Sequence, residues 1–141
     1  MGYDIIAYFS VNQEEQMEEF IRENNIDKND SKQCHLMVDF YKSQNPDLKN
    51  ERILYDWNEE YQKHEFFSYY GTNFIRDDTR LHDSRLPACL QYLNFNLHTP
   101  EDAIEIADAL HEYFENDYNL MDFARWLKIT SKYCFRYRLS R

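Results

Sequence analysis

The densest group of residues that could do chemistry lies between residues 76 and 85. Its carboxylates and imidazole are Asp77, Asp78, His82 and Asp83. Carboxylates with a histidine can hold Mg²⁺ or Mn²⁺, and the arginines interleaved with them could neutralise a phosphate in a transition state. One hypothesis is therefore a small metal-dependent hydrolase or nuclease. Alternating charges in a solvated loop compensate one another and give the same pattern, which is the interpretation we favour.

A second group is aromatic and precedes the first directly. The string YYGTNFIR at 69–76 combines paired tyrosines, a glycine, an amide and an arginine, which are residue types enriched where proteins bind one another. Packing at the end of a strand would also explain it. We take Tyr69, Tyr70, Asn73 and Arg76 as candidate partner-binding residues. Our first hypothesis is a non-enzymatic interaction or assembly module that binds a protein partner or a second copy.

Other recognisable chemistry is missing from the sequence. The chain has 2 glycines and neither glycine-rich phosphate motif, so we expect no nucleotide cofactor, and we expect no other cofactor. The GxSxG and HExxH motifs of common hydrolases are absent too. The 3 cysteines and 5 histidines do not have zinc-finger spacing, so we expect no zinc finger, and the sequence leaves any metal unknown.

Charge is distributed unevenly along the chain. The net charge of the chain is −10, yet the stretch 125–141 contains six basic residues and no acidic residue. The acidic remainder repels phosphate backbones, so nucleic-acid binding is not expected unless this basic strip is presented alone. We expect the strip to be held against the acid-rich stretch 101–122 or against a second copy.

The setting of the protein follows from cysteine usage and hydropathy. Cys34, Cys89 and Cys134 are odd in number and widely spaced, and no secretory leader precedes the first polar segment. No apolar run approaches the roughly 20 residues that a membrane-spanning helix needs, so no membrane partner is expected. These features predict reduced thiols and a cytoplasmic location.

Hydrophobic periodicity and capping residues predict the order of the elements. Strands are expected at 3–9, at 53–57 and 66–70 as a hairpin, at 92–97, and at 135–139. Helices are expected to begin after Asn12, Ser31, Thr99 and Asn119; the first should turn its glutamates to water. The strongest signal is Thr99-Pro100-Glu101-Asp102, a capping hydroxyl before a proline and two acids.

These elements predict an α+β fold for the whole chain. We expect a single mixed or antiparallel sheet of about four to five strands, with about four helices on one face, in one domain spanning 1–141. The alternation of Phe135, Tyr137 and Leu139 with arginines is typical of an edge strand with its charges in water. Strand order does not follow from the sequence.

Three strings carry a resemblance to a known group of proteins. They are YDIIAYF at 3–9, YGTNFIRDD at 70–78 and WLKIT at 126–130. They are similar to uncharacterised proteins of giant DNA viruses of the mimivirus kind. The resemblance implies a host-cytoplasm or virion setting, which adds a virion structural component as a further alternative. It implies no activity and no catalytic residue.

Overall fold

The computed structural model describes residues 4–71 and 79–140, with the side chains of 94 and 95 left aside. Its strands are β1 (Asp4–Phe9), β2 (Ile53–Asn58), β3 (Lys63–Gly71) and β4 (Cys134–Ser140). Its longer helices are α1 (Glu14–Glu23), α2 (Cys34–Gln44), α5 (Pro100–Phe114) and α6 (Tyr118–Ser131), and α4 (Leu93–Asn96) is a single turn. The α+β class is confirmed, with four strands and four longer helices in the described residues.

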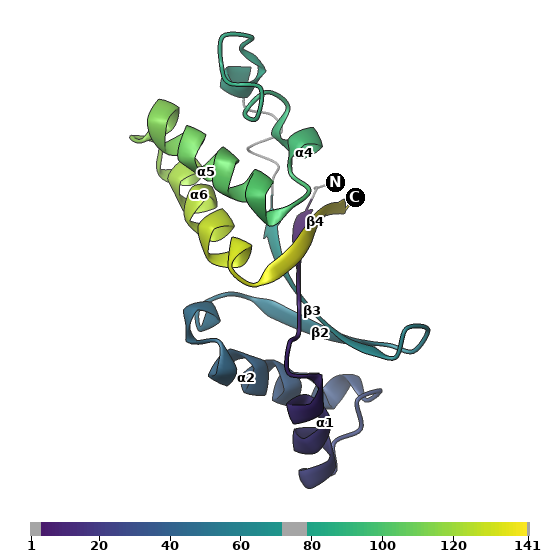
Figure 1. The fold of residues 1–141 in the computed structure, drawn as a ribbon. Coiled ribbons are helices and arrows are strands. Elements are labelled where there is room, and N and C mark those ends of the chain that lie inside the picture. The colour runs from purple at the N-terminus through teal and green to yellow at the C-terminus, as the bar shows by residue number, and fades with distance from the viewer. Residues whose placement is uncertain (1–3, 72–78, 141) are drawn as a thin grey trace.

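All neighbouring strands of the sheet are antiparallel, in the order β2-β3-β1-β4. The β2–β3 hairpin is confirmed. Helices α1 and α2 connect β1 to β2, and α5 and α6 connect β3 to β4, where they form an antiparallel pair (Figure 1). The element order and strand order are those of the split βαβ, or ferredoxin-like, arrangement, with two longer helices in each crossover.

The hydrophobic core lies between the helices and one face of the sheet. Because side chains alternate along a strand, Ile5, Ala7 and Phe9 of β1 point to the same face as Phe66 of β3, and all four are buried. The Phe66 ring stacks on Tyr41 of α2 at 4.1 Å between centroids. The buried apolar residues of α1, α2, α5 and α6 belong to this same cluster. The longer helices therefore cover one face, as predicted.

Helix starts were predicted with mixed success. The capping box at α5 is confirmed: Thr99 accepts from the amide of Asp102, whose carboxylate accepts from the amide of Thr99. The other caps were wrong by one or two residues. Gln13 precedes α1 without a side-chain cap, and the cap of α6 is Asp117, which accepts from Leu120 N at 3.0 Å. Ser31 begins a 3-10 turn, capped by Asp30, that leads into α2.

The strand expected at 92–97 is wrong, because this segment contains the helical turn α4. Tyr92 enters the turn in the left-handed region, with φ of 53°. Leu93 and Leu97, four residues apart, are both buried, and the Asn96 side chain donates to carbonyls of the preceding turn. Leu93 and Leu97 fit the spacing of a helix as well as the alternation of a strand. The hydrogen bonds of the Asn96 side chain favour the helix.

The edge-strand prediction for the carboxyl-terminal segment is confirmed, since β4 is the last strand of the sheet. The helical part of the basic strip lies against acids of the body. Lys128 of α6 contacts Asp108 of α5 at 2.7 Å, and Arg125 contacts Glu51 at 3.3 Å. The two arginines of β4 have a different environment.

Candidate functional site

The second face of the sheet is not covered by any of the described longer helices. Its side chains follow from the strand register: Leu54, Phe67, Tyr8 and Arg136 form one row across the four strands. A neighbouring row contains Tyr69, Ile6 and Arg138. Ile6 is 3 % exposed although it lies outside the core cluster, so these side chains shield it themselves. We call this surface the open face.

Aromatic rings and arginines are in contact on the open face. The Tyr8 ring lies 5.9 Å from Phe67 and 6.2 Å from Phe135, which joins the surface at a register shift between β1 and β4. The guanidinium carbons of Arg136 and Arg138 lie over the Tyr8 ring at 5.2 and 5.5 Å from its centre. Such stacking leaves the N–H groups of both arginines available, and neither arginine has a carboxylate within ion-pair distance among the described residues.

Negative charge lies on the opposite edge of the open face. Asp56 of β2 and Glu65 of β3 are register partners one row beyond Phe67, on the same face. Asp56 is exposed, and Glu65 is half-buried and accepts a hydrogen bond from Asn58 at 2.9 Å. The β2–β3 side of the open face therefore carries Asp56 and Glu65, which we call its acidic edge, with the exposed Lys63 one row beyond them. The centre is aromatic, and the β4 edge carries two arginines.

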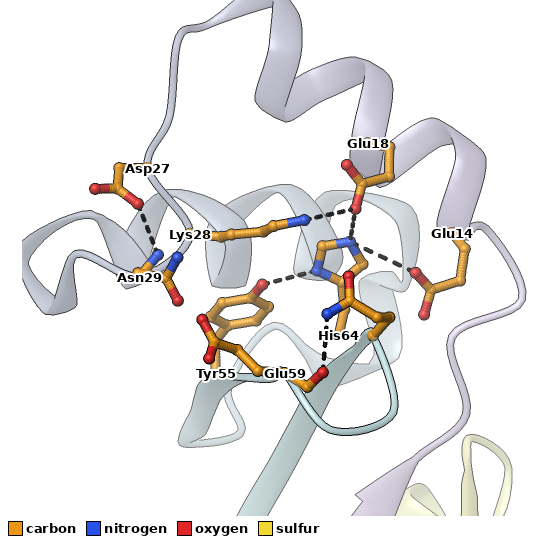
Figure 2. Close-up of polar contacts among 9 residues, drawn as sticks. Glu14, Glu18, Asp27, Lys28, Asn29, Tyr55, Glu59 and His64 are labelled. Atoms are coloured by element: carbon orange, nitrogen blue, oxygen red, sulfur yellow. Dashed lines mark hydrogen bonds and ion pairs between the residues drawn. The ribbon is translucent and has the colours of Figure 1, made fainter.

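A polar cluster lies where α1 passes the start of β3 (Figure 2). Glu14 and Glu18, one helical turn apart on α1, both turn toward the His64 ring of β3. His64 Nε2 is 2.8 Å from a Glu18 oxygen and 3.5 Å from a Glu14 oxygen. The His64 side chain is fully buried, although the two carboxylates are only half-buried. The other glutamates of α1 are exposed as expected, whereas Glu14 and Glu18 are only partly exposed and face His64.

Neighbouring groups hold this cluster in place. The Tyr55 hydroxyl lies 2.7 Å from His64 Nδ1, so both nitrogens of the ring are engaged. Lys28 Nζ lies 3.3 Å from Glu18 and 3.5 Å from the centre of the Trp57 ring. Burial opposes ionisation of Glu18, but hydrogen bonds from His64 and Lys28 outweigh it, and the pKa of Glu18 is lowered. Burial also raises the pKa of Tyr55, which therefore stays neutral near pH 7.

A pocket of about 420 Å³ joins the polar cluster to the open face. Glu14 and His64 line it, as do Ser10 and Val11 in the segment that follows β1. Tyr61 and Phe135, which are 67 % and 55 % exposed, lie at its opening. Lys63, Glu65 and Arg136 also line the pocket, so charges of both signs surround an aromatic interior.

The aromatic candidates from the sequence are divided between surfaces. Tyr69 lies on the open face beside Phe67, with 5.5 Å between ring centres. Tyr70 points to the helices instead, where its hydroxyl donates to Asp122 at 3.1 Å and its ring packs on Phe123 and Trp126. Asn73 and Arg76 lie outside the described residues.

Half of the predicted acidic loop can also be placed. Asp77 and Asp78 lie outside the described residues. His82 stacks on Tyr92 at 5.2 Å, whereas Asp83 forms a two-pronged pair with Arg85, at 2.7 and 3.0 Å. This pair lowers the pKa of Asp83 to about 2 through hydrogen bonds from Arg85. His82 and Asp83 thus have separate partners, and the metal-site hypothesis for this loop stays a prediction.

Comparisons with known proteins give no relative for this chain: no family model, no curated protein and no solved structure matches it. The resemblance to giant-virus proteins and the virion alternative therefore stay predictions. None of the helices in the described ranges is long and apolar enough to cross a membrane.

Proposed function

We propose that the protein is a non-enzymatic assembly module that forms a homodimer through the open face. The observation behind this proposal is the opposite charge at the two edges of one aromatic surface. Arg136 and Arg138 lie at the β4 edge, and Asp56 and Glu65 lie toward the β2 edge. A surface with this distribution is complementary to a second copy of itself.

A twofold axis parallel to the strands makes this complementarity concrete. Rotation about such an axis stacks two open faces and places β4 of each copy over β2 of the other. Stacked sheets lie about 10 Å apart, a distance that aromatic side chains span. The rotation keeps each row at its position along the strands, so Arg136 of one copy lies one row, roughly 7 Å, from Asp56 of the second, and the same contact occurs twice.

A second copy fits the open face better than a nucleic acid does. A base would have to stack on Tyr8, where two guanidinium groups already lie. Phosphates would also meet Asp56, Glu65 and a protein of net charge −10. An acidic peptide would satisfy the arginines but would leave the acidic edge facing like charge.

The test is a complementary exchange of charges. One variant carries Arg136→Glu with Arg138→Glu, and the other carries Asp56→Lys with Glu65→Lys. Each variant alone faces like charge across the dimer, and we expect its dimer dissociation constant in analytical ultracentrifugation to rise at least about 100-fold. In an equimolar mixture, the introduced glutamates of the first variant face the introduced lysines of the second. At the other contact the arginines of the second variant face the native acids of the first, so a heterodimer should form.

Controls separate this contact from a general effect of charge. Arg22→Glu with Lys32→Glu makes the same change in net charge at exposed positions of the helical side, and it should leave the dimer intact. The dimer should also weaken as salt rises. A wild-type protein that stays monomeric into the millimolar range refutes the proposal, as does a mixture that does not associate. Binding of single-stranded RNA or of an acidic peptide by monomeric wild type, lost in Arg136→Glu with Arg138→Glu, would also refute it and assign the face to that ligand.

A further inference from the structure

We infer that Glu14, Glu18 and His64 form a binding site for a divalent metal ion of the zinc class. This inference is independent of the dimer, because none of the three residues belongs to the open face. Zinc accepts histidine nitrogen and carboxylate oxygen at about 2.0–2.2 Å, and its open sites take three protein ligands. This set offers one nitrogen and two carboxylates.

The ligand atoms are already close enough for one ion. One oxygen of each glutamate and a nitrogen of His64 all lie within 4.8 Å of one another. Ligands of one tetrahedral zinc ion lie roughly 3.3–3.6 Å apart, given those bond lengths. His64 Nε2 is 3.5 Å from Glu14 and 2.8 Å from Glu18, so a small rotation of the half-buried Glu18 side chain would admit the ion.

The orientation of His64 is fixed in the way that metal sites require. A ligating histidine usually donates its second ring N–H to an oxygen, which sets the tautomer and aims the other nitrogen at the ion. The Tyr55 hydroxyl can accept from Nδ1 at 2.7 Å, and the ring is fully buried. With the proton on Nδ1, the lone pair of Nε2 points between the two carboxylates (Figure 2).

Charge around the cluster also suits a divalent cation. Two carboxylates and a neutral imidazole carry two negative charges, and the ion would neutralise both. In the structure Lys28 balances part of this charge at Glu18. Lys28 contacts the same Glu18 oxygen as His64, so the ion must bind the other Glu18 oxygen or displace the ammonium, which keeps its contact with the face of Trp57.

A route to the site and room for a fourth ligand are present. Glu14 and His64 line the 420 Å³ pocket that opens toward Tyr61 and Phe135. A zinc ion with three protein ligands keeps its fourth position for water or a small anion. Lys63 and Arg136 also line this pocket, and their positive charge favours an anion in it.

Zn²⁺ itself is the probe, added to the untagged full chain in competition with a chromophoric chelator. We expect one ion per chain and a rise in melting temperature. Glu14→Gln with Glu18→Gln should weaken affinity at least about 100-fold, as should His64→Gln. Tyr55→Phe should weaken it roughly 10- to 100-fold, because it removes the oxygen that orients the ring. Glu15→Gln with Glu19→Gln removes equal charge from exposed positions of α1 and should change nothing.

A second readout distinguishes this site from the thiols. Co²⁺ bound by oxygen and nitrogen should give visible bands without thiolate-to-cobalt charge transfer, since Cys34, Cys89 and Cys134 are not ligands. Equal Zn²⁺ affinity in wild type and Glu14→Gln with Glu18→Gln, a thiolate band, or no one-to-one binding would each overturn the inference. The glutamate variant changes only half-buried carboxylates, so circular dichroism should show it folded even if His64→Gln is not.

Discussion

Adjacent phenylalanines on β3 test whether the two faces of the sheet differ as described. Phe66 is 0 % exposed, stacks on Tyr41 and contacts Tyr55 at 5.2 Å between ring centres. Phe66→Ala removes a fully buried ring and leaves a cavity beneath α2, which typically lowers the free energy of unfolding by about 3–5 kcal/mol. That is a large share of the roughly 5–15 kcal/mol of an ordinary domain.

Phe67→Ala is the matched control, since it removes the same atoms one residue later on the opposite face. The Phe67 ring is partly exposed and contacts only Tyr8 and Tyr69 among the described rings. We expect its loss to lower the free energy of unfolding of the monomer by about 1 kcal/mol. The same variant should weaken the proposed dimer, because Phe67 lies at the centre of the open face.

The assay is urea unfolding followed by circular dichroism. Phe66→Ala should move the midpoint far more than Phe67→Ala, with similar slopes. Both variants belong in the Arg136→Glu, Arg138→Glu background, so that dimerisation does not contribute. Equal losses of stability would mean that Phe67 is packed as deeply as Phe66, and the assignment of core and open faces would be wrong.

Two further predictions concern local contacts. Thr99→Ala removes the hydroxyl that caps α5, so the free energy of unfolding should fall by about 1 kcal/mol in urea unfolding, whereas Thr99→Ser should lose much less; equal losses would contradict a capping role. Asp83 has a folded pKa of about 2, below its value in the unfolded chain, so its contribution to stability is complete above about pH 4 and disappears as pH falls toward 2. Arg85→Ala should return the pKa of Asp83 to its ordinary range, which a carboxyl titration followed by NMR would measure. An unchanged pKa would refute the pairing.

Sequence patterns predicted those elements whose signals are local and consistent. Strand β1 and the hairpin are short apolar runs of strand formers, and the Thr99 box specifies a helix start by itself. The segment 92–97 was predicted wrongly because Leu93 and Leu97 fit either period, and the hydrogen bonds of Asn96 decide between them. The observed helix starts differ from the predicted ones by one or two residues, because several polar residues precede α1 and α6 and each of them could cap the helix.

The polar cluster could not be found from the sequence. Glu18 and His64 are 46 positions apart, and the register of β3 alone decides that His64 faces α1. One signal was available: Glu14 and Glu18 are four residues apart, which places them on one side of a helix. The spacing was obscured by Glu15, Glu19 and Glu23, which suggested a uniformly solvated surface.

The aromatic face was similarly visible only in part. Tyr69 and Tyr70 were predicted as one binding unit, but neighbouring residues of a strand point to opposite faces, and only Tyr69 reaches the open one. The partners of Tyr69 on that face come from β1 and β4, at the two ends of the chain. Strand order brings them together, and strand order was not available from the sequence.

The pocket connects the two proposals. Tyr8, Phe135 and Arg136 belong to the open face and also line the pocket that leads to Glu14 and His64. A second copy stacked on the open face would therefore cover the opening of the pocket. Any anion that binds the fourth position of the metal must then either enter before dimerisation or compete with it for Arg136. By linkage, such an anion would weaken the dimer by the same factor by which the dimer weakens anion binding. Zinc alone contacts no residue of the open face and should leave the dimer constant unchanged.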